Sequence, residues 1–130
     1  MYLLDTNILI HFLKGNPTVR ENMTRVGQER LAISEVSLAE LYYGAYYSQR
    51  SQENLATVDK LRLCLYVLSL EEDASRYFGR IKTALRRQGN LIEDLDILIA
   101  AVALANKLIL VTDNTRHFER IENLRLENWV

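Results

Sequence analysis

The sequence predicts an α/β domain built on a small, mostly parallel sheet. Short apolar runs with the length of buried strands alternate along the chain with segments of helical periodicity. The 130 residues are 48% hydrophobic and include only five glycines and one proline, which suits one core without a flexible linker. We therefore expect a single domain over residues 1–130.

The first half of the chain predicts two strands and four helices. Strands are expected at residues 2–4 and 31–33, and helices at residues 8–13, 17–26, 34–47 and 55–65. Asn16 is a suitable N-cap, with Pro17 in the first helical position. Tyr42, Tyr43, Tyr46 and Tyr47 have helical spacing and are expected in the core or in a dimer interface, with stacking on nucleobases as the alternative.

The second half predicts two further buried strands, at residues 66–68 and 108–111, and an edge strand around residues 124–126. The segment Ser69-Leu70-Glu71-Glu72 has the pattern of a capping box, and Gly89-Asn90 is expected to end the helix that follows it. Residues 94–107 are apolar almost all round, as is typical of a buried helix. The strand at 108–111 leads directly into Thr112-Asp113-Asn114.

Charge, cysteine content and hydropathy limit the classes of protein to which this chain can belong. The formal net charge of −1 does not by itself indicate nucleic-acid binding. The single cysteine, Cys64, excludes an internal disulfide and is expected in the core. The first twenty residues lack the pattern of a signal peptide, and the longest apolar run, residues 97–105, is too short to span a membrane. We expect a soluble cytoplasmic protein.

Acidic residues recur where strands end and helices begin. Asp5 and Asp113 follow predicted strands, Glu40 lies early in the helix after the second strand, and Asp94 and Asp96 open the most apolar helix. Because strand ends and helix starts share one edge of a parallel sheet, these carboxylates are expected to converge there. Converging carboxylates need protons or cations, and hard oxygen ligands suit Mg²⁺ or Mn²⁺. Such sites hydrolyse phosphodiesters.

Each acid also has a simpler explanation. Asp5 would cap the helix that follows it, and Asp94 would cap the helix at 94–107. Glu40 completes a second capping-box pattern, Ser37-x-x-Glu40, and Asp113 suits a turn. Asp96 is the hardest to explain in this way, because it lies within a helix that has little polar face.

Four motifs, in this order, resemble those of the PIN-domain family. They are LLDTNILI, SLAELYYG with Glu40, EDLDILIAAVAL with Asp96, and LVTDNTRHF. The closest likeness is to the VapC-type toxins of bacterial toxin–antitoxin pairs, and it covers essentially the whole chain. The resemblance implies a three-layer α/β/α sandwich and Mg²⁺- or Mn²⁺-dependent endoribonuclease activity on RNA such as tRNA or rRNA.

The resemblance also implies a set of site residues. The first metal-binding Asp of the family falls on Asp5, its Glu on Glu40 and its third acid on Asp96. The fourth position departs from the family pattern: either Asp113 supplies a carboxylate, or Asn114 acts as a neutral ligand. Positions expected to orient an acid or a water are Thr6, Asn7, Thr112, Asn114 and Asp94.

The resemblance further implies a cognate antitoxin, a homodimer and a chain that does not bind membranes. Candidate RNA contacts are Arg76, Arg80 and Arg87 on one helix face, together with Arg116. His11 and His117 are expected to be structural or surface residues. The rival functions are a PIN-like DNA nuclease, a PIN-like binding module without catalysis and, with least support, a phosphorylated receiver domain, which expects adjacent early acids that this chain lacks.

Overall fold

The computed structural model describes residues 1–130 and contains one five-stranded sheet in the order β3-β2-β1-β4-β5. Every pair of neighbouring strands is parallel. The strands are β1 (Tyr2–Leu4), β2 (Leu31–Ser34), β3 (Tyr66–Leu68), β4 (Ile109–Val111) and β5 (Leu126–Glu127). The expected α/β class with a parallel sheet is confirmed.

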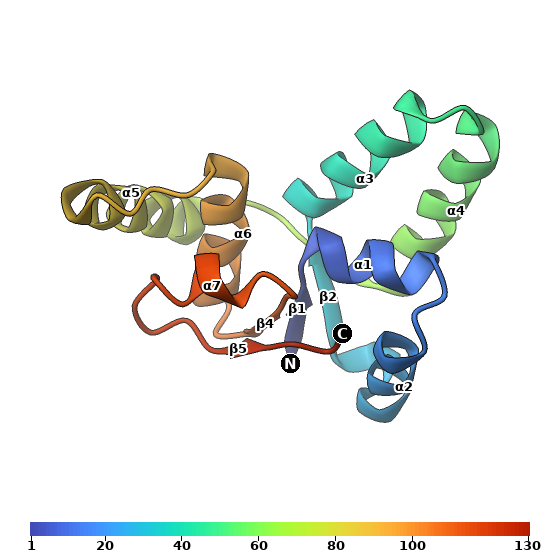
Figure 1. The fold of residues 1–130 in the computed structure, drawn as a ribbon, viewed down its shortest axis with the longest axis horizontal. Helices are drawn as coiled ribbons and strands as arrows, with labels where there is room; N and C mark the ends of the chain where they lie inside the picture. The colour runs from blue at the N-terminus through green and yellow to red at the C-terminus, as the bar shows by residue number, and fades with distance from the viewer.

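Helices cover both faces of the sheet (Figure 1). They are α1 (Thr6–Leu13), α2 (Pro17–Val26), η1 (Gln28–Arg30), α3 (Glu35–Tyr47), α4 (Ser51–Cys64), α5 (Glu72–Gln88), α6 (Asp94–Ala105) and α7 (Thr115–Phe118). Helices α5 and α6 pack with Leu3 of β1 in one core, whereas α1 to α4 pack with Leu4 in another. Because successive strand side chains point to opposite faces, the short central strand supplies both cores, and the expected sandwich is confirmed.

The chain winds in opposite directions from β1, since β2 and β3 lie on one side of it and β4 and β5 on the other. Leu4 pairs with Val111, so β1 and β4 end side by side. In open parallel sheets, a crevice forms at such a switch point, beyond the carboxyl ends of the strands. Asp5 and Thr112, the residues that follow these two strands, therefore stand at the position where a ligand is expected.

Three expected helix caps are wrong. Helix α5 begins at Glu72 without a side-chain cap, because the N–H of Leu70 donates to Glu35 Oε1 at 2.7 Å and the preceding segment stays extended. Helix α6 is preceded by Glu93 in the N-cap position, so Asp94 is already helical. The Ser37-x-x-Glu40 capping box does not form, because the Ser34 hydroxyl caps α3 by accepting from Ser37 N.

One burial prediction is wrong, and a second is confirmed only in part. Cys64 is exposed at the end of α4, because Leu61 and Leu65 occupy the buried face there. Tyr42 packs half-buried against the core that α1 to α4 form. Tyr43, Tyr46 and Tyr47 are 69%, 70% and 80% exposed, so these three rings lie outside the core. The alternatives of a dimer interface or base stacking stay predictions for them. None of the helices combines the length and the apolar character that a membrane-spanning segment requires.

Candidate functional site

Asp5 directly follows β1 and so lies at the edge of the sheet, where α1 and the residue after β4 donate hydrogen bonds to it. Its Oδ1 accepts from Thr6 N at 2.8 Å, so the carboxylate caps α1 as the simpler explanation required. Its Oδ2 accepts from the Thr112 hydroxyl at 2.8 Å, and its own N–H donates to Val111 O. Asp5 as a whole is only 4% exposed, yet each carboxylate oxygen keeps a lone pair for a further ligand.

Burial raises the pKa of Asp5 from 3.8 to about 6, against the hydrogen bonds from Thr112 and Thr6 that lower it. The charges of Asp96 and Glu40 contribute to this rise. A buried carboxylate facing two others costs free energy unless a proton or a cation neutralises it. The Asp5 environment therefore favours positive charge at this position.

Glu40 reaches the site from α3, the helix that follows β2. Its Oε1 accepts from the Thr6 hydroxyl at 2.7 Å, so Thr6 contacts Asp5 through its N–H and Glu40 through its side chain. Thr6 is 8% exposed and Glu40 is half-buried. One residue thus fixes the spacing of two of the three acids.

Asp96 lies in the first turn of α6, and its side chain is 26% exposed. Burial raises its pKa, as do the charges of Glu40 and Glu93, whereas His117, with Nδ1 at 4.0 Å from Asp96 Oδ2, lowers it. Asp94, two residues earlier, is not brought into the cluster and instead pairs with Lys82 Nζ at 2.9 Å. The site therefore takes one of the two acids that open α6.

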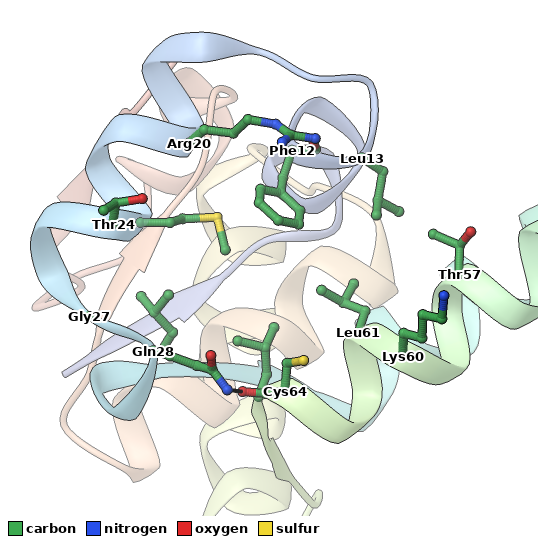
Figure 2. Close-up of a pocket in the computed structure, with 13 residues that line it drawn as sticks. Phe12, Leu13, Arg20, Thr24, Gly27, Gln28, Thr57, Lys60, Leu61 and Cys64 are labelled. Atoms are coloured by element: carbon green, nitrogen blue, oxygen red, sulfur yellow. Dashed lines mark hydrogen bonds between the residues drawn. The ribbon is translucent and has the colours of Figure 1, made fainter.

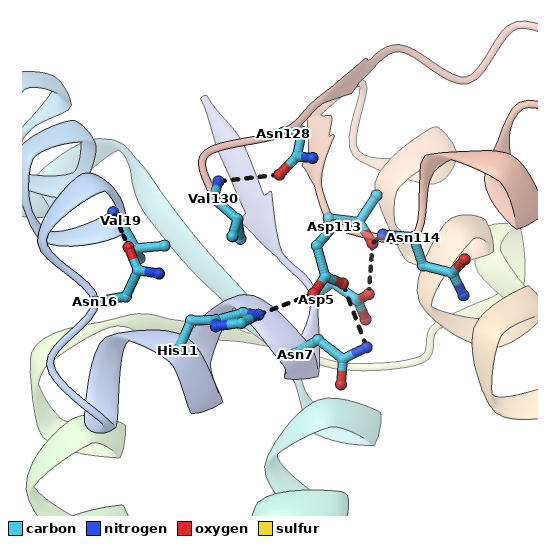
Figure 3. Close-up of polar contacts among 10 residues, drawn as sticks. Asp5, Asn7, His11, Asn16, Val19, Asp113, Asn114, Asn128 and Val130 are labelled. Carbon is cyan, nitrogen blue, oxygen red and sulfur yellow. Dashed lines mark hydrogen bonds and ion pairs between the residues drawn. The ribbon is translucent and has the colours of Figure 1, made fainter.

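The two residues after Thr112 face different neighbours. The Asp113 carboxylate contacts His11 Nε2 at 2.9 Å and Asn7 Nδ2 at 3.5 Å, both from α1 (Figure 3). The Asn114 N–H donates to the Thr112 hydroxyl, and its side-chain amide contacts His117 Nδ1 at 2.8 Å. Neither Asp113 nor Asn114 makes a hydrogen bond to Asp5.

Both histidines lie beside the site, and their expected role as structural or surface residues stays a prediction. Asn7 and His11 are four residues apart and so share one face of α1, which turns toward the end of β4. This i, i+4 spacing next to Asp5 was the available signal for His11. No local pattern marks His117, because its role depends on where α7 meets α6.

The donor set of Asp5, Glu40 and Asp96 contains only carboxylate oxygens, which suit a hard divalent cation. No three His, Cys, Asp or Glu side chains converge closely enough to enclose an ion by themselves. Mg²⁺ usually keeps several water ligands and takes few from protein. The residues present fit such an ion if water or substrate oxygens complete its shell.

The candidate RNA contacts lie outside the carboxylate cluster. Arg76 pairs with Glu72 at 3.3 Å within α5, and the Arg80 guanidinium lies over the Tyr77 ring at 5.1 Å. Arg87 and Arg116 are exposed. The α5 arginines thus form a solvent-facing surface beside the site rather than part of it.

A separate pocket of about 520 Å³ lies between α1, α2 and α4 (Figure 2). Apolar side chains such as Phe12, Met23 and Leu61 line most of it. The charged residues among its walls are Arg20 and Lys60, and no carboxylate lines it. The Arg20 guanidinium lies over the Phe12 ring at 5.0 Å. This pocket is therefore apolar with a cationic border, the reverse of the carboxylate site.

Comparison with known proteins gives matches over the whole chain. The family model for the PIN domain matches residues 2–124. Ribonuclease VapC2 of Haemophilus influenzae is 42% identical over 131 residues, covering 99% of this chain and 98% of the relative. The tRNA(fMet)-specific endonuclease VapC of Shigella flexneri is 39% identical over 128 residues, covering 98% and 97%.

Solved structures agree with the fold. VapBC2 from Rickettsia felis, bound to a DNA fragment from its promoter, superposes with a TM-score of 0.94 at 34% identity, covering 99% of this chain and 98% of that one. DNA-bound VapBC from Salmonella typhimurium gives a TM-score of 0.94 at 37% identity, covering 99% and 98%. The likeness therefore extends to all layers of the sandwich.

Proposed function

The chain belongs to the PIN-domain family, and we propose that it is a divalent-metal-dependent endoribonuclease that acts as the toxin of a toxin–antitoxin pair. The observation that carries this proposal is the meeting of Asp5, Glu40 and Asp96 at the switch point of the sheet. Burial and the neighbouring negative charges raise the pKa of both Asp5 and Asp96, which a fold tolerates where a cation is to be bound. Nucleases of this family generally depend on divalent metal ions.

Asp5, Glu40 and Asp96 are the residues that would hold the ion, which we propose to be Mg²⁺ or Mn²⁺. Such an ion lowers the pKa of water and offsets the negative charge of a phosphodiester. The protein supplies the geometry: the Thr112 hydroxyl and Thr6 N–H fix the Asp5 carboxylate, and the Thr6 hydroxyl fixes Glu40. A water at this edge would be oriented by the same carboxylates.

RNA is the proposed substrate, because the relatives are named ribonucleases and one is named for tRNA(fMet). A structured RNA such as tRNA or rRNA would bring phosphates to the carboxylates through the cation. The exposed guanidinium groups of Arg76, Arg80, Arg87 and Arg116 are proposed to contact neighbouring phosphates. An RNA substrate also places the proposed activity in the cytoplasm.

The proposed partner is a cognate antitoxin, since the similar structures from Rickettsia felis and Salmonella typhimurium are VapBC complexes. We place its docking on the pocket between α1, α2 and α4. This surface offers apolar walls flanked by Arg20 and Lys60 and bears no carboxylate, so it is complementary to an amphipathic segment with acidic side chains.

The proposal is tested by RNA cleavage with and without Asp5→Asn. Purified chain, free of antitoxin, is incubated with total RNA and separately with single-stranded DNA, in the presence of Mg²⁺, Mn²⁺ or a chelator. We expect discrete RNA products with either metal, a loss of at least about 100-fold in rate for Asp5→Asn, and no products with the chelator.

The matched control is Asp73→Asn, an exposed acid in the first turn of α5, which should cleave like the unmodified protein. Cleavage of DNA rather than RNA would favour the DNA-nuclease alternative. Cleavage that Asp5→Asn leaves intact would remove Asp5 from the mechanism. The absence of metal-dependent cleavage of either nucleic acid would favour the non-catalytic binding module.

A further inference from the structure

The segment after β4 presents its two polar side chains to opposite sides of the site. Both carboxylate oxygens of Asp113 are engaged by α1: Oδ2 lies 2.9 Å from His11 Nε2 and Oδ1 lies 3.5 Å from Asn7 Nδ2 (Figure 3). Asn114 faces His117, which in turn lies beside Asp96. Asp113 is thus directed toward α1, whereas Asn114 is directed toward His117.

The electrostatics of the cluster agree with this geometry. The carboxylates whose charges raise the pKa of Asp5 are those of Asp96 and Glu40, and those acting on Asp96 are Glu40 and Glu93. Asp113 is not among them. Its half-buried carboxylate instead has a histidine Nε2 as partner, which donates in the protonated ring and in one neutral tautomer.

We propose that His11 is a positioning residue that acts through Asp113 to tie α1 to the end of β4, and that Asp113 lies outside the ligand set of Asp5, Glu40 and Asp96. The inference rests on the proposed function, because a ligand set exists only if the chain binds a metal. The tie immediately follows Thr112, whose hydroxyl donates to Asp5 Oδ2. Holding Asp113 therefore holds this donor against Asp5.

A measurement of metal affinity tests whether Asp113 is a metal ligand or only holds α1 against the end of β4. Mn²⁺ is titrated into the unmodified protein, Asp96→Asn and Asp113→Asn, and free Mn²⁺ is followed by electron paramagnetic resonance. Asp96→Asn is expected to weaken binding at least about tenfold, and Asp113→Asn, which leaves all three proposed ligands in place, to weaken it clearly less. Comparable losses for the two variants would overturn the proposal.

RNA cleavage by the unmodified protein, measured in parallel, keeps the two proposals apart. A protein that does not cleave RNA refutes the proposed function. A protein that cleaves RNA, but whose Mn²⁺ affinity depends on Asp113, refutes only the present inference.

The positioning role is tested by a double-mutant cycle on the metal-free protein. His11→Leu and Asp113→Asn are each expected to lower the melting temperature by roughly 3–5 °C, and the double variant to fall no further. His11→Gln, which keeps an amide donor, should recover much of the loss. It should also restore kcat for RNA cleavage, which His11→Leu lowers without changing KM. Additive losses, or a Gln variant no better than Leu, would contradict the tie.

Discussion

Helix α1 begins in one environment and ends in its opposite. At its N-terminus, Asp5 and Thr6 meet the carboxylates of Glu40 and Asp96, and burial together with these negative charges raises the pKa of Asp5 to about 6. At its C-terminus, Phe12 and Leu13 form part of an apolar pocket bordered by Arg20 and Lys60. The N-terminal end therefore favours the binding of a positive charge, and the C-terminal end leaves apolar surface open to a partner.

The two ends of α1 therefore suit two different ligands, a cation at the polar end and an apolar partner segment at the other. The polar end is built from residues at the carboxyl edge of the sheet, where backbone N–H groups and hydroxyls hold the acids. The apolar end is built from helix side chains that the second core does not fully cover. Changes at one end should therefore act on catalysis and charge, and changes at the other on partner binding.

The largest expected effect distinguishes two acids in the same helix. Asp96→Asn should reduce the rate of RNA cleavage by at least about 100-fold, because it removes a charge from the cluster at the N-terminal end of α1. Asp94→Asn breaks only the partly exposed contact with Lys82 and should change the rate by less than about threefold. Initial rates at saturating Mg²⁺ test the pair, and equal losses would place both acids in the site.

The second effect is on stability and has a defined pH dependence. The folded state raises the pKa of Asp5 from 3.8 to about 6, so between these pH values the folded protein holds a proton that the unfolded chain has released. The free energy of unfolding of the metal-free protein should therefore fall as pH rises through this window, by at most about 3 kcal/mol, and level off above it. The raised pKa of Asp96 acts in the same direction.

Asp5→Asn removes this cost and should stabilise the metal-free protein by about 2 kcal/mol at pH 8 while flattening the pH dependence. The amide can keep both contacts, since its oxygen accepts from Thr6 N and its NH₂ group can donate to the Thr112 hydroxyl. Urea unfolding at pH 5 and pH 8 measures the effect. A destabilised Asn variant at pH 8 would show that the charge is not costly.

Much of the fold could be predicted because its signals are local. The strands at 2–4 and 66–68 and the Asn16-Pro17 helix start appear where the apolar runs and the cap place them. The approach of Asp5, Glu40 and Asp96 also followed from parallel topology. The caps at Ser69 and Asp94 failed where distant residues hold the same segments: Glu35 accepts from the N–H of Leu70, and Lys82 pairs with the Asp94 carboxylate.

What could not be predicted depends on which side chain faces which element. The sequence left open whether Asp113 or Asn114 approaches the cluster, because consecutive residues in an irregular turn have no fixed period. The contact of His11 with Asp113 depends on how α1 packs against the end of β4. The pocket at Phe12 depends on how α1, α2 and α4 pack together. Cys64 was misplaced because an apolar stretch at a helix end does not show which face is buried.

The third effect concerns the apolar end of α1. Lys60→Glu reverses a charge at the border of the pocket and should weaken binding of the cognate antitoxin by about tenfold, without changing cleavage by the free protein. Arg50→Glu, an exposed reversal at the other end of α4, serves as the control and should change affinity much less. Isothermal titration with the antitoxin compares them, and equal effects would indicate only general electrostatic attraction.

The smallest expected effect concerns the hydrogen bond that stabilises the charged form of Asp5 at the N-terminal end of α1. Thr112→Val keeps the shape of a fully buried side chain but removes the hydroxyl that donates to Asp5 Oδ2 and accepts from Asn114 N. Because this hydrogen bond lowers the pKa of Asp5, its loss should raise that pKa further and cost about 1 kcal/mol of stability at pH 8. Thr112→Ser retains the donor and should behave like the unmodified protein. Carboxyl ¹³C shifts of Asp5 followed against pH measure the pKa directly, and an unchanged value in the Val variant would show that the Thr112 hydroxyl does not lower it.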